Sequence, residues 1–332
     1  MSNSVISFRI DGRQTTLVFA WQDGVPAVVY HGNSLPAGLD LETFCQTLIK
    51  PVVSSSLDQR EPVSLHPEAG RGFPGHPAMI AHRQGNGGTA WAGRFTLTGY
   101  ESTDQSVVFN LVDSNRNISL NLKCTIDPDT DVAEFATTIK NNADSPFLID
   151  WLAAPTVVPD QHLNEYMMFH GRWCAEFSIN RGEIPVGQIR QENRRGRTSH
   201  EAFPGIVLLN GSTDENAGDC LGVHLGWSGN HRIVLERLPS GDVQLQMGTL
   251  LFSGEGELQP GESVTTPTLY CAYSNSGLND MSQKFHAHVR RNLLNFPDKE
   301  VPRPVTVNTW EAIYFDHDMK RLVELADAAA EF

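Results

Sequence analysis

The feature that most constrains this chain is a long succession of short β-type runs separated by turn residues. It extends from Ser4 to about Tyr273. Two early runs, residues 5–10 and 15–20, are separated by an Asp11-Gly12 dipeptide, which is typical of β-hairpins. Many short strands with turns between them favour a large antiparallel sandwich, so the sequence predicts a mainly β fold over residues 1–275. Later runs of the same kind are residues 95–98, 106–112, 118–125, 133–139, 205–209, 221–227, 243–247 and 269–273.

The pattern changes after residue 275. Apolar residues spaced by four at Met281, Phe285, Val289 and Leu293 predict an amphipathic helix over residues 278–294. Arginines 290 and 291 lie near its end, where cations interact favourably with the helix dipole. Residues 295–304 contain three prolines and predict a linker, so residues 276–303 are interpreted as helix and linker.

The last segment, residues 304–332, predicts one strand and one helix. Residues 304–310 are typical of a compact strand, and Asp318 can cap a helix that follows a polar loop. One such β/α unit cannot bury its own faces. We therefore expect this segment to be incomplete by itself and to promote self-association through exposed apolar residues. These are Val305, Val307, Leu322 and Leu325.

Composition excludes several classes of partner. The 332 residues include 25 Lys and Arg against 39 Asp and Glu, a net charge of −14, which disfavours nucleic acid and anionic membranes as partners. No apolar run approaches the roughly 20 residues of a membrane-spanning helix, and residues 1–13 lack the hydrophobic stretch of a secretory signal. Five widely separated cysteines cannot all pair, which favours a cytoplasmic protein with reduced thiols in its core.

Several motifs, taken in order, resemble one enzyme family. Residues 302–316 are similar to the beginning of the catalytic barrel of glycoside hydrolase family 36 α-galactosidases, which include raffinose-hydrolysing enzymes. The upstream motifs Phe-His-Gly-Arg-Trp, Arg-Arg-Gly-Arg-Thr-Ser-His, Gly-Trp-Ser-Gly-Asn-His and Leu-Gln-Pro-Gly-Glu-Ser occur in the order that this family shows. They occupy residues 169–173, 194–200, 226–231 and 258–263, and a Thr-Pro pair follows at 266–267.

The resemblance implies a β-supersandwich, a (β/α)8 barrel and a small C-terminal β domain. It also implies retaining cleavage of terminal α-galactosyl groups by two aspartates, whose carboxyl groups stand roughly 5–5.5 Å apart in retaining enzymes. A barrel needs roughly 250 residues, and about 30 follow Val301 here. The family's nucleophile and paired-aspartate motifs are absent, so we expect an N-terminal α-galactosidase portion without its catalytic aspartates, inactive alone and oligomeric when intact.

Two residues at the predicted barrel strand are candidates for substrate binding. If Trp310 ends that strand, it stands at the face where barrel active sites are built, and an indole stacks on the apolar face of a sugar. Glu311 is a candidate for accepting hydrogen bonds from sugar hydroxyls. The alternative interpretation is that Trp310 packs internally and Glu311 is solvated.

Three further candidates lie in the sandwich. Arg197 and His200 belong to the basic run 194–200, for which direct sugar contact and a surface loop tied down by ion pairs are the alternatives. The resemblance places this loop at the barrel mouth or between subunits. Trp173 is interpreted either as a core tryptophan or as a residue at the edge of the substrate pocket, while Trp227 is assigned to structure.

Metal and phosphate sites are not predicted. His286 and His288 point to different faces of their helix, and the other histidines lack ligand spacing, so no metal and no cofactor are expected. The glycine-rich run 70–75 lacks the lysine of a phosphate loop, and a mobile loop or flap is preferred. The family has a substrate-touching aspartate near this position, where His76 and Pro77 stand here.

Two other function classes stay open. One is a stand-alone carbohydrate-binding or assembly module, and the other is an aldose-epimerase-like enzyme acting on free sugar. The second requires a histidine and a carboxylate facing one sugar, and no such pair can be named from the sequence.

Overall fold

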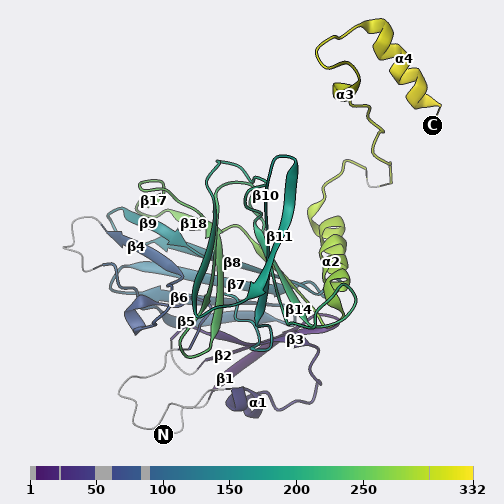
Figure 1. Cartoon of the computed structure of the whole chain (residues 1–332). Helices are drawn as coiled ribbons and strands as arrows, with labels where there is room; N and C mark the ends of the chain where they lie inside the picture. Colours follow the sequence, from purple (N-terminus) through teal and green to yellow (C-terminus); the bar gives the residue numbers. More distant parts are fainter. Residues whose placement is uncertain (1–4, 22–23, 49–61, 84–89, 299, 332) are drawn as a thin grey trace. The chain divides into compact units, whose positions relative to one another are not determined.

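The computed structural model describes residues 5–21, 24–48, 62–83, 90–298 and 300–331. The chain forms two compact units, Met1–Asn292 and Leu293–Phe332, and each is described by itself (Figure 1). The first unit is built from antiparallel sheets, as the succession of short β-type runs predicts. In the described part of the chain, no helix combines the length and apolar character that crossing a bilayer requires.

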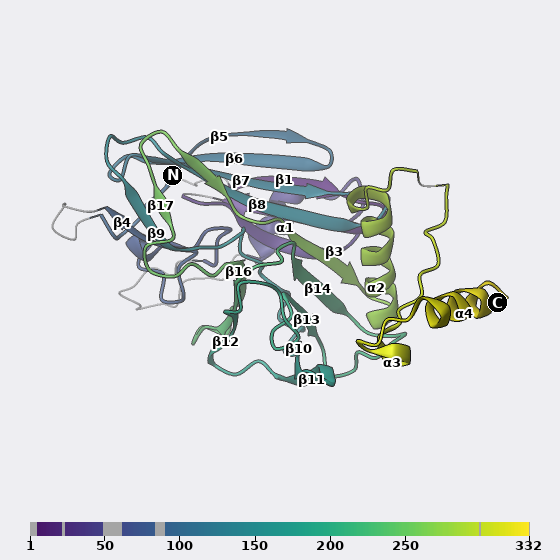
Figure 2. The ribbon, with the colours of Figure 1, turned by 90° about the horizontal axis from the view of Figure 1, so that it is seen from above.

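The described residues of the first unit form four antiparallel sheets. The largest has 10 strands, in the order β11-β10-β13-β14-β19-β8-β7-β6-β5 with β18 also pairing β8, and Figure 2 shows β5 to β8 side by side. Its strands are β5 (Thr96–Thr103), β6 (Ser106–Asp113), β7 (Ile118–Ile126), β8 (Val132–Asn141), β10 (Glu165–Arg172), β11 (Ala175–Glu183), β13 (Gly205–Leu209), β14 (Cys220–Leu225), β18 (Ser263–Thr265) and β19 (Leu269–Ser274).

The other three sheets have three strands each. Their orders are β1-β2-β3, β12-β15-β16 and β17-β9-β4. The strands are β1 (Ile6–Asp11), β2 (Thr15–Trp21), β3 (Ala27–Asn33), β12 (Gly187–Asn193), β15 (His231–Arg237), β16 (Val243–Thr249), β17 (Glu257–Leu258), β9 (Phe147–Leu152) and β4 (Met79–Arg83). A short helix, α1 (Leu41–Leu48), and a 3-10 turn, η1 (Ala69–Arg71), lie in the connections between them.

The predicted Asp-Gly hairpin is confirmed. Strands β1 and β2 are antiparallel with Asp11 opposite Thr16, and the Gly12 N–H donates to the Thr15 carbonyl at 2.9 Å. Strand β2 is buried along its whole length, which explains why its sequence is an unbroken apolar and threonine run. The other runs expected as strands lie in β5, β6, β7, β8, β13, β14, β16 and β19.

One hydrophobic core joins the sheets of the first unit. Phe19 of β2 meets Phe109 of β6 edge-on with ring centroids 5.6 Å apart, and both are fully buried. The same cluster includes Phe147 of β9 and Leu245 of β16. Since these residues come from four different sheets, no sheet of this unit is an independent domain.

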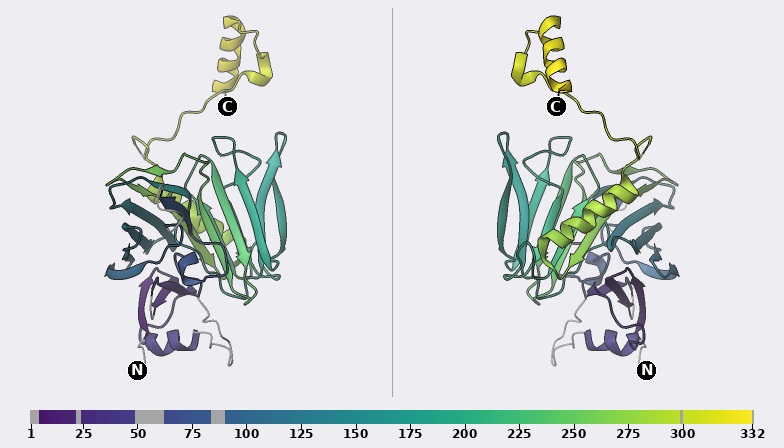
Figure 3. Two further views of the ribbon diagram at one scale, coloured as in Figure 1. Left: turned by 90° about the vertical axis from the view of Figure 1, so that its left-hand side faces the viewer. Right: turned by 90° about the vertical axis from the view of Figure 1, so that its right-hand side faces the viewer.

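The predicted amphipathic helix is confirmed as α2 (Gly277–His288), extended by a π-helical turn, η2 (Val289–Leu293). It lies across the large sheet, as Figure 3 shows, and packs against β8, β14 and β19, with Met281 and Phe285 in the hydrophobic cluster that joins them. Gly222 of β14 allows this close approach, because a Cβ atom there would collide with the Met281 sulfur. The helix therefore belongs to the first unit.

The second unit differs from expectation at its start. Residues 304–310 are in no strand of the described structure, and helix α3 (Trp310–Ile313) begins where the strand was expected to end. A strand needs a neighbour for its backbone groups, and none of the described segments pairs with this one. The Asn308 side chain instead accepts the Trp310 N–H at 2.8 Å and starts the helical turn.

The predicted final helix is confirmed as α4 (Met319–Ala330). The Asp318 side chain accepts the Arg321 N–H at 3.3 Å, the N-cap that the sequence predicts. No residue of α4 is buried, so its apolar stripe lacks cover within the described structure.

Candidate functional site

Three loops of the sandwich lie against one another where β12, β14, β15 and β16 begin or end. We call residues 193–204, 226–231 and 249–257 the end loops. Asn230 joins all three: its side-chain oxygen accepts the Gly196 N–H at 2.7 Å and its carbonyl accepts the Leu250 N–H at 3.1 Å. The Thr198 hydroxyl donates to the Trp227 carbonyl at 3.2 Å. The end loops are therefore a rigid platform for side chains.

Two arginines of the basic run are tied down by ion pairs. Arg194 pairs with Glu192, and Arg195 pairs with Glu201. Desolvation raises the pKa of Glu192, but hydrogen bonds from Arg194 and from Arg232 outweigh it and the net shift is downward. This network fixes the backbone on either side of residue 197.

Arg197 and His200, the two candidates in this loop, are both exposed. The Arg197 carbonyl accepts the Asn193 side-chain amide at 2.6 Å, so its backbone is held. Its guanidinium forms no hydrogen bond or ion pair within the described residues. Arg197, unlike Arg194 and Arg195, therefore has a guanidinium that is available to bind a ligand. Its role in substrate binding stays a prediction.

Trp173 is not a core residue, so that interpretation is wrong. Its side chain is 77% exposed at the turn between β10 and β11. Phe169, Phe177 and Phe203 form an aromatic cluster that links this hairpin to the end loops, with centroids of 5.1 to 5.8 Å. Strand β11 is the last strand of the large sheet in the described part of the chain.

His76 stands on a buried ladder of polar side chains. Its Nδ1 lies 2.9 Å from the Pro77 carbonyl and 3.1 Å from the Gln246 side-chain oxygen, which also accepts the Trp151 indole N–H. Both neighbours of Nδ1 are acceptors, so Nδ1 carries the proton. Desolvation lowers the pKa of His76, although the hydrogen bonds that its Nδ1 donates to the Gln246 and Pro77 oxygens act in the opposite direction.

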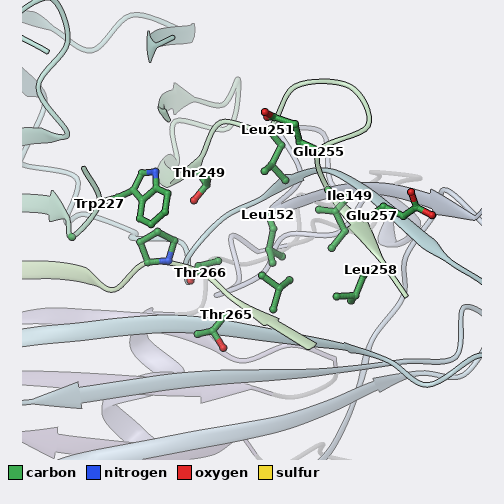
Figure 4. A pocket seen from close by; sticks show the side chains of 14 residues that line it. Ile149, Leu152, Trp227, Thr249, Leu251, Glu255, Glu257, Leu258, Thr265 and Thr266 are labelled. Atoms are coloured by element: carbon green, nitrogen blue, oxygen red, sulfur yellow. The ribbon is translucent and has the colours of Figure 1, made fainter. Parts of the chain in front are cut away.

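A cavity of about 570 Å³ opens beside Trp227 (Figure 4). Its walls come from β9, from the segment 264–267 and from the end loops. Aliphatic side chains such as Leu152 and Leu258 line it, and the Glu255 and Glu257 carboxylates stand at its edge. Sequence reasoning assigned Trp227 to structure and did not consider the two glutamates, which no motif marks.

The candidates in the second unit are both exposed. The Trp310 ring meets Tyr314 and Phe315 edge-on at 5.4 and 5.1 Å, which forms an aromatic cluster within that unit. Glu311 follows in α3 and makes no side-chain hydrogen bond among the described residues. Trp310 therefore begins a helix, and its predicted place at the end of a strand is wrong.

Groups suited to a metal are not found among the residues that the structure covers. All five cysteines are free, and four of them are buried; Cys174, beside Trp173, is exposed. Burial raises the pKa of Cys220 to about 12, so that thiol stays protonated.

The chain matches the sequence profiles of one enzyme family. The profile described as "Glycosyl hydrolase family 36 N-terminal domain" matches residues 24–259, and the profile described as "Melibiase" matches residues 263–332. An α-galactosidase of Escherichia coli is 34% identical over 286 residues, which are 86% of this chain and 40% of that enzyme. The bifunctional α-galactosidase/sucrose kinase AgaSK of Mediterraneibacter gnavus is 26% identical over 302 residues, 91% of this chain and 32% of that protein.

Solved structures share the fold. The family 36 α-galactosidase AgaA of Geobacillus stearothermophilus, in complex with raffinose, has a TM-score of 0.86 at 23% identity, covering 98% of this chain and 48% of that one. The chain thus spans less than half the length of these relatives. Because the N-terminal profile alone matches well over half of its residues, the chain belongs to glycoside hydrolase family 36.

Proposed function

We propose that this chain is the N-terminal portion of an α-galactosidase that hydrolyses terminal α-galactosyl groups of melibiose- and raffinose-type sugars with retention. The observation that carries the proposal is the match of residues 24–259 to the family's N-terminal profile, followed by the melibiase profile. In this proposal residues 1–275 form the sandwich, 276–303 connect it onward, and 304–332 lead into the catalytic barrel. The catalytic aspartates belong to the part that this chain lacks.

The chain's own contribution is to shape the sugar pocket and support the barrel. Trp310 supplies a stacking surface and Glu311 accepts hydroxyl hydrogen bonds. Trp173, Arg197 and His200 contact substrate from the sandwich side. Their exposure supports this role, since each offers an aromatic, cationic or imidazole group that the rest of the chain does not cover.

A fusion experiment tests the proposal. The chain alone should hydrolyse 4-nitrophenyl α-D-galactopyranoside no faster than a mock preparation. A fusion of this chain to the part of the E. coli α-galactosidase that follows its aligned segment should hydrolyse it with turnover. Hydrolysis by the unfused chain above the mock level would contradict the assignment of the aspartates to the missing part.

Within the fusion, two tryptophan variants separate the roles. Trp310→Ala should lower kcat/KM by about tenfold or more, the effect of losing about 1.4 kcal/mol of stacking in the transition state. Trp91→Ala removes another exposed tryptophan, one not assigned to the site, and should leave kcat/KM unchanged. Equal activity of the Trp310 variant and the unchanged fusion would remove Trp310 from the site.

We further propose that the intact protein is a homo-oligomer in the cytoplasm. Strand β11 ends the large sheet and exposes Phe177 and Ile179, which supports an interface there. The five free thiols support a reducing compartment. Light scattering on the fusion should give a mass above the monomer's, and Phe177→Ser with Ile179→Ser should lower it.

The alternative function is a stand-alone carbohydrate-binding or assembly module. The exposed apolar residues of the second unit, such as Val305 and Val307, weigh against it, because a module evolved to stand alone would cover them. A chain that is monodisperse, monomeric and unable to support activity in the fusion would favour the module.

A further inference from the structure

We infer that the cavity beside Trp227 binds a neutral pyranoside, which makes it a sugar site of the sandwich itself. The inference stands on the cavity's own geometry and chemistry and does not require the reaction proposed above. All the residues that line the cavity belong to the first unit.

The orientation of the Trp227 indole is fixed by two features of its loop. Its N–H donates to the Asn230 carbonyl at 3.0 Å, which pins the edge of the ring. Gly229 lies directly against the ring, since a Cβ atom there would stand 2.6 Å from the indole nitrogen. The ring is nevertheless 42% exposed and lines the cavity. The indole is therefore held by a hydrogen bond, packs against a glycine and lines the cavity. In this orientation it is a preformed surface on which a sugar ring can stack.

Acceptors stand across the cavity from the indole in Figure 4. One oxygen of Glu255 accepts the Phe252 N–H at 2.6 Å, and one oxygen of Glu257 accepts the Gln259 side-chain amide at 3.0 Å. Each bond holds its carboxylate in place and leaves a second oxygen without a partner in the described structure. Charge-assisted acceptors of this kind bind sugar hydroxyls strongly.

Charge and size select the class of ligand. Among the described residues, no lysine, arginine or histidine lines the cavity, and the two carboxylates repel anions, which disfavours sugar phosphates and uronic acids. The volume of about 570 Å³ lies within the range of roughly 300 to 1,000 Å³ that is usual for small-molecule sites. Aliphatic walls such as Leu152 and Leu251 suit the C–H face of a pyranose or an apolar aglycone.

One other class of ligand is tested together with the sugar. An organic cation would also use an aromatic ring and carboxylates, through a cation–π contact. The two classes respond differently to removal of the negative charge.

The experiment is a titration of the 332-residue chain labelled with 5-fluorotryptophan, followed by fluorine NMR. Six tryptophans give six resonances, and Trp227→Phe identifies the one of interest. Methyl α-D-galactopyranoside, methyl β-D-glucopyranoside and raffinose are the sugar probes, and tetramethylammonium is the cation probe. We expect a saturable shift of the Trp227 resonance with at least one sugar, and none with tetramethylammonium.

Variants give the quantitative readout. Trp227→Ala should weaken sugar binding by about tenfold or more in calorimetry, and Glu255→Gln by about threefold, since a neutral amide oxygen still accepts. Trp91→Ala, which removes an exposed tryptophan that is not assigned to any site, should leave the affinity unchanged. Trp227→Phe should retain binding, which guards against a failure of the alanine variant to fold.

Two outcomes overturn the inference. One is the absence of any saturable shift up to about 100 mM of every sugar probe. The other is binding of tetramethylammonium that Glu255→Gln abolishes, which would identify a cation site. Because the readout is binding to the chain alone, it can fail while the activity of the fusion succeeds, and the reverse also holds.

Discussion

Single residues show how burial sets protonation in this sandwich, and His66 is the plainest case. Its side chain is 1% exposed, its Nδ1 has no hydrogen-bond partner, and its ring meets Phe95 edge-on at 5.5 Å. Desolvation, together with the nearby Arg116 charge, lowers the pKa of His66 to about 3. The folded protein therefore holds this ring neutral under conditions in which the unfolded chain protonates it.

This difference makes stability depend on pH. Because the folded pKa lies below the unfolded value of about 6.5, the unfolded chain binds the extra proton, and stability falls as the pH drops from about 6.5 toward 3. Between pH 7.5 and pH 5 the loss attributable to His66 is about 2 kcal/mol, at about 1.4 kcal/mol per unit below 6.5. Urea unfolding of the chain and of His66→Gln at both pH values measures it.

The variant should lose less stability than the unchanged chain on going from pH 7.5 to pH 5, whatever its stability at pH 7.5. His170→Gln is the matched control, since His170 is exposed on β10. An acid loss that is the same in all three proteins would show that His66 is not the cause.

Prediction from sequence is least secure for residues whose role depends on distant neighbours. Trp173 lies in a sequence compatible with a core position, and only the pairing of β10 with β11 reveals that it stands at a turn. The local sequence assigns Trp227 to structure because the residue stands at the end of a strand, just before a turn that contains a glycine. The cavity beside it joins segments more than 100 residues apart, from Ile149 to Pro267, and no local pattern contains that information.

Elements were predictable where burial alternates along the strand. Strand β6 alternates buried and partly exposed residues along its whole length, which is the pattern that sequence reasoning detects. Strand β11 alternates apolar and polar residues from Ala175 to Asn180, but it is exposed at nearly every position and is not among the runs that the sequence predicts as strands. The segment 304–310 shows the opposite failure, because its alternating valines suggest a strand although none of the described strands pairs with it.

The contact between α2 and β14 allows a test at the scale of elements. Gly222→Val places a side chain where Met281 and Phe285 pack, and should destabilise the chain by about 2 kcal/mol through overpacking. Combining it with Met281→Ala should recover at least about 1 kcal/mol, because the shortened side chain makes room. Chemical unfolding of the four members of this cycle measures the coupling.

Gly99→Val is the matched control for this cycle. Gly99 also lies in a strand, β5, and a Cβ atom there would meet nothing within 4 Å. The control should stay within about 0.5 kcal/mol of the unchanged chain. Additive effects of Gly222→Val and Met281→Ala would show that the two side chains do not compete for the same space.

At the scale of the molecule, the boundary between the two family profiles does not coincide with the boundary between the two units. The N-terminal profile ends at residue 259, whereas the first unit continues to Asn292. Strand β19 pairs with β14 on one side and β8 on the other, so it lies inside the large sheet. Leu269 and Cys271 of this strand are fully buried in the core. The sandwich is therefore completed by residues that match the melibiase profile.

Two truncations distinguish the structural boundary from the profile boundary. A chain ending at Asn292 retains every residue of the five hydrophobic clusters found in the described structure. It should unfold cooperatively with a Tm within about 3 °C of the full chain. A chain ending at Gln259 lacks β18, β19 and α2, which leaves β8 and β14 without the strand that joins them, and it should not give a cooperative transition.

Calorimetry and near-ultraviolet circular dichroism of both chains decide between the boundaries. Cooperative unfolding of the shorter chain at an unchanged Tm would mean that β19 is dispensable to the core, and loss of the transition in the longer chain would mean that residues beyond Asn292 are needed for it.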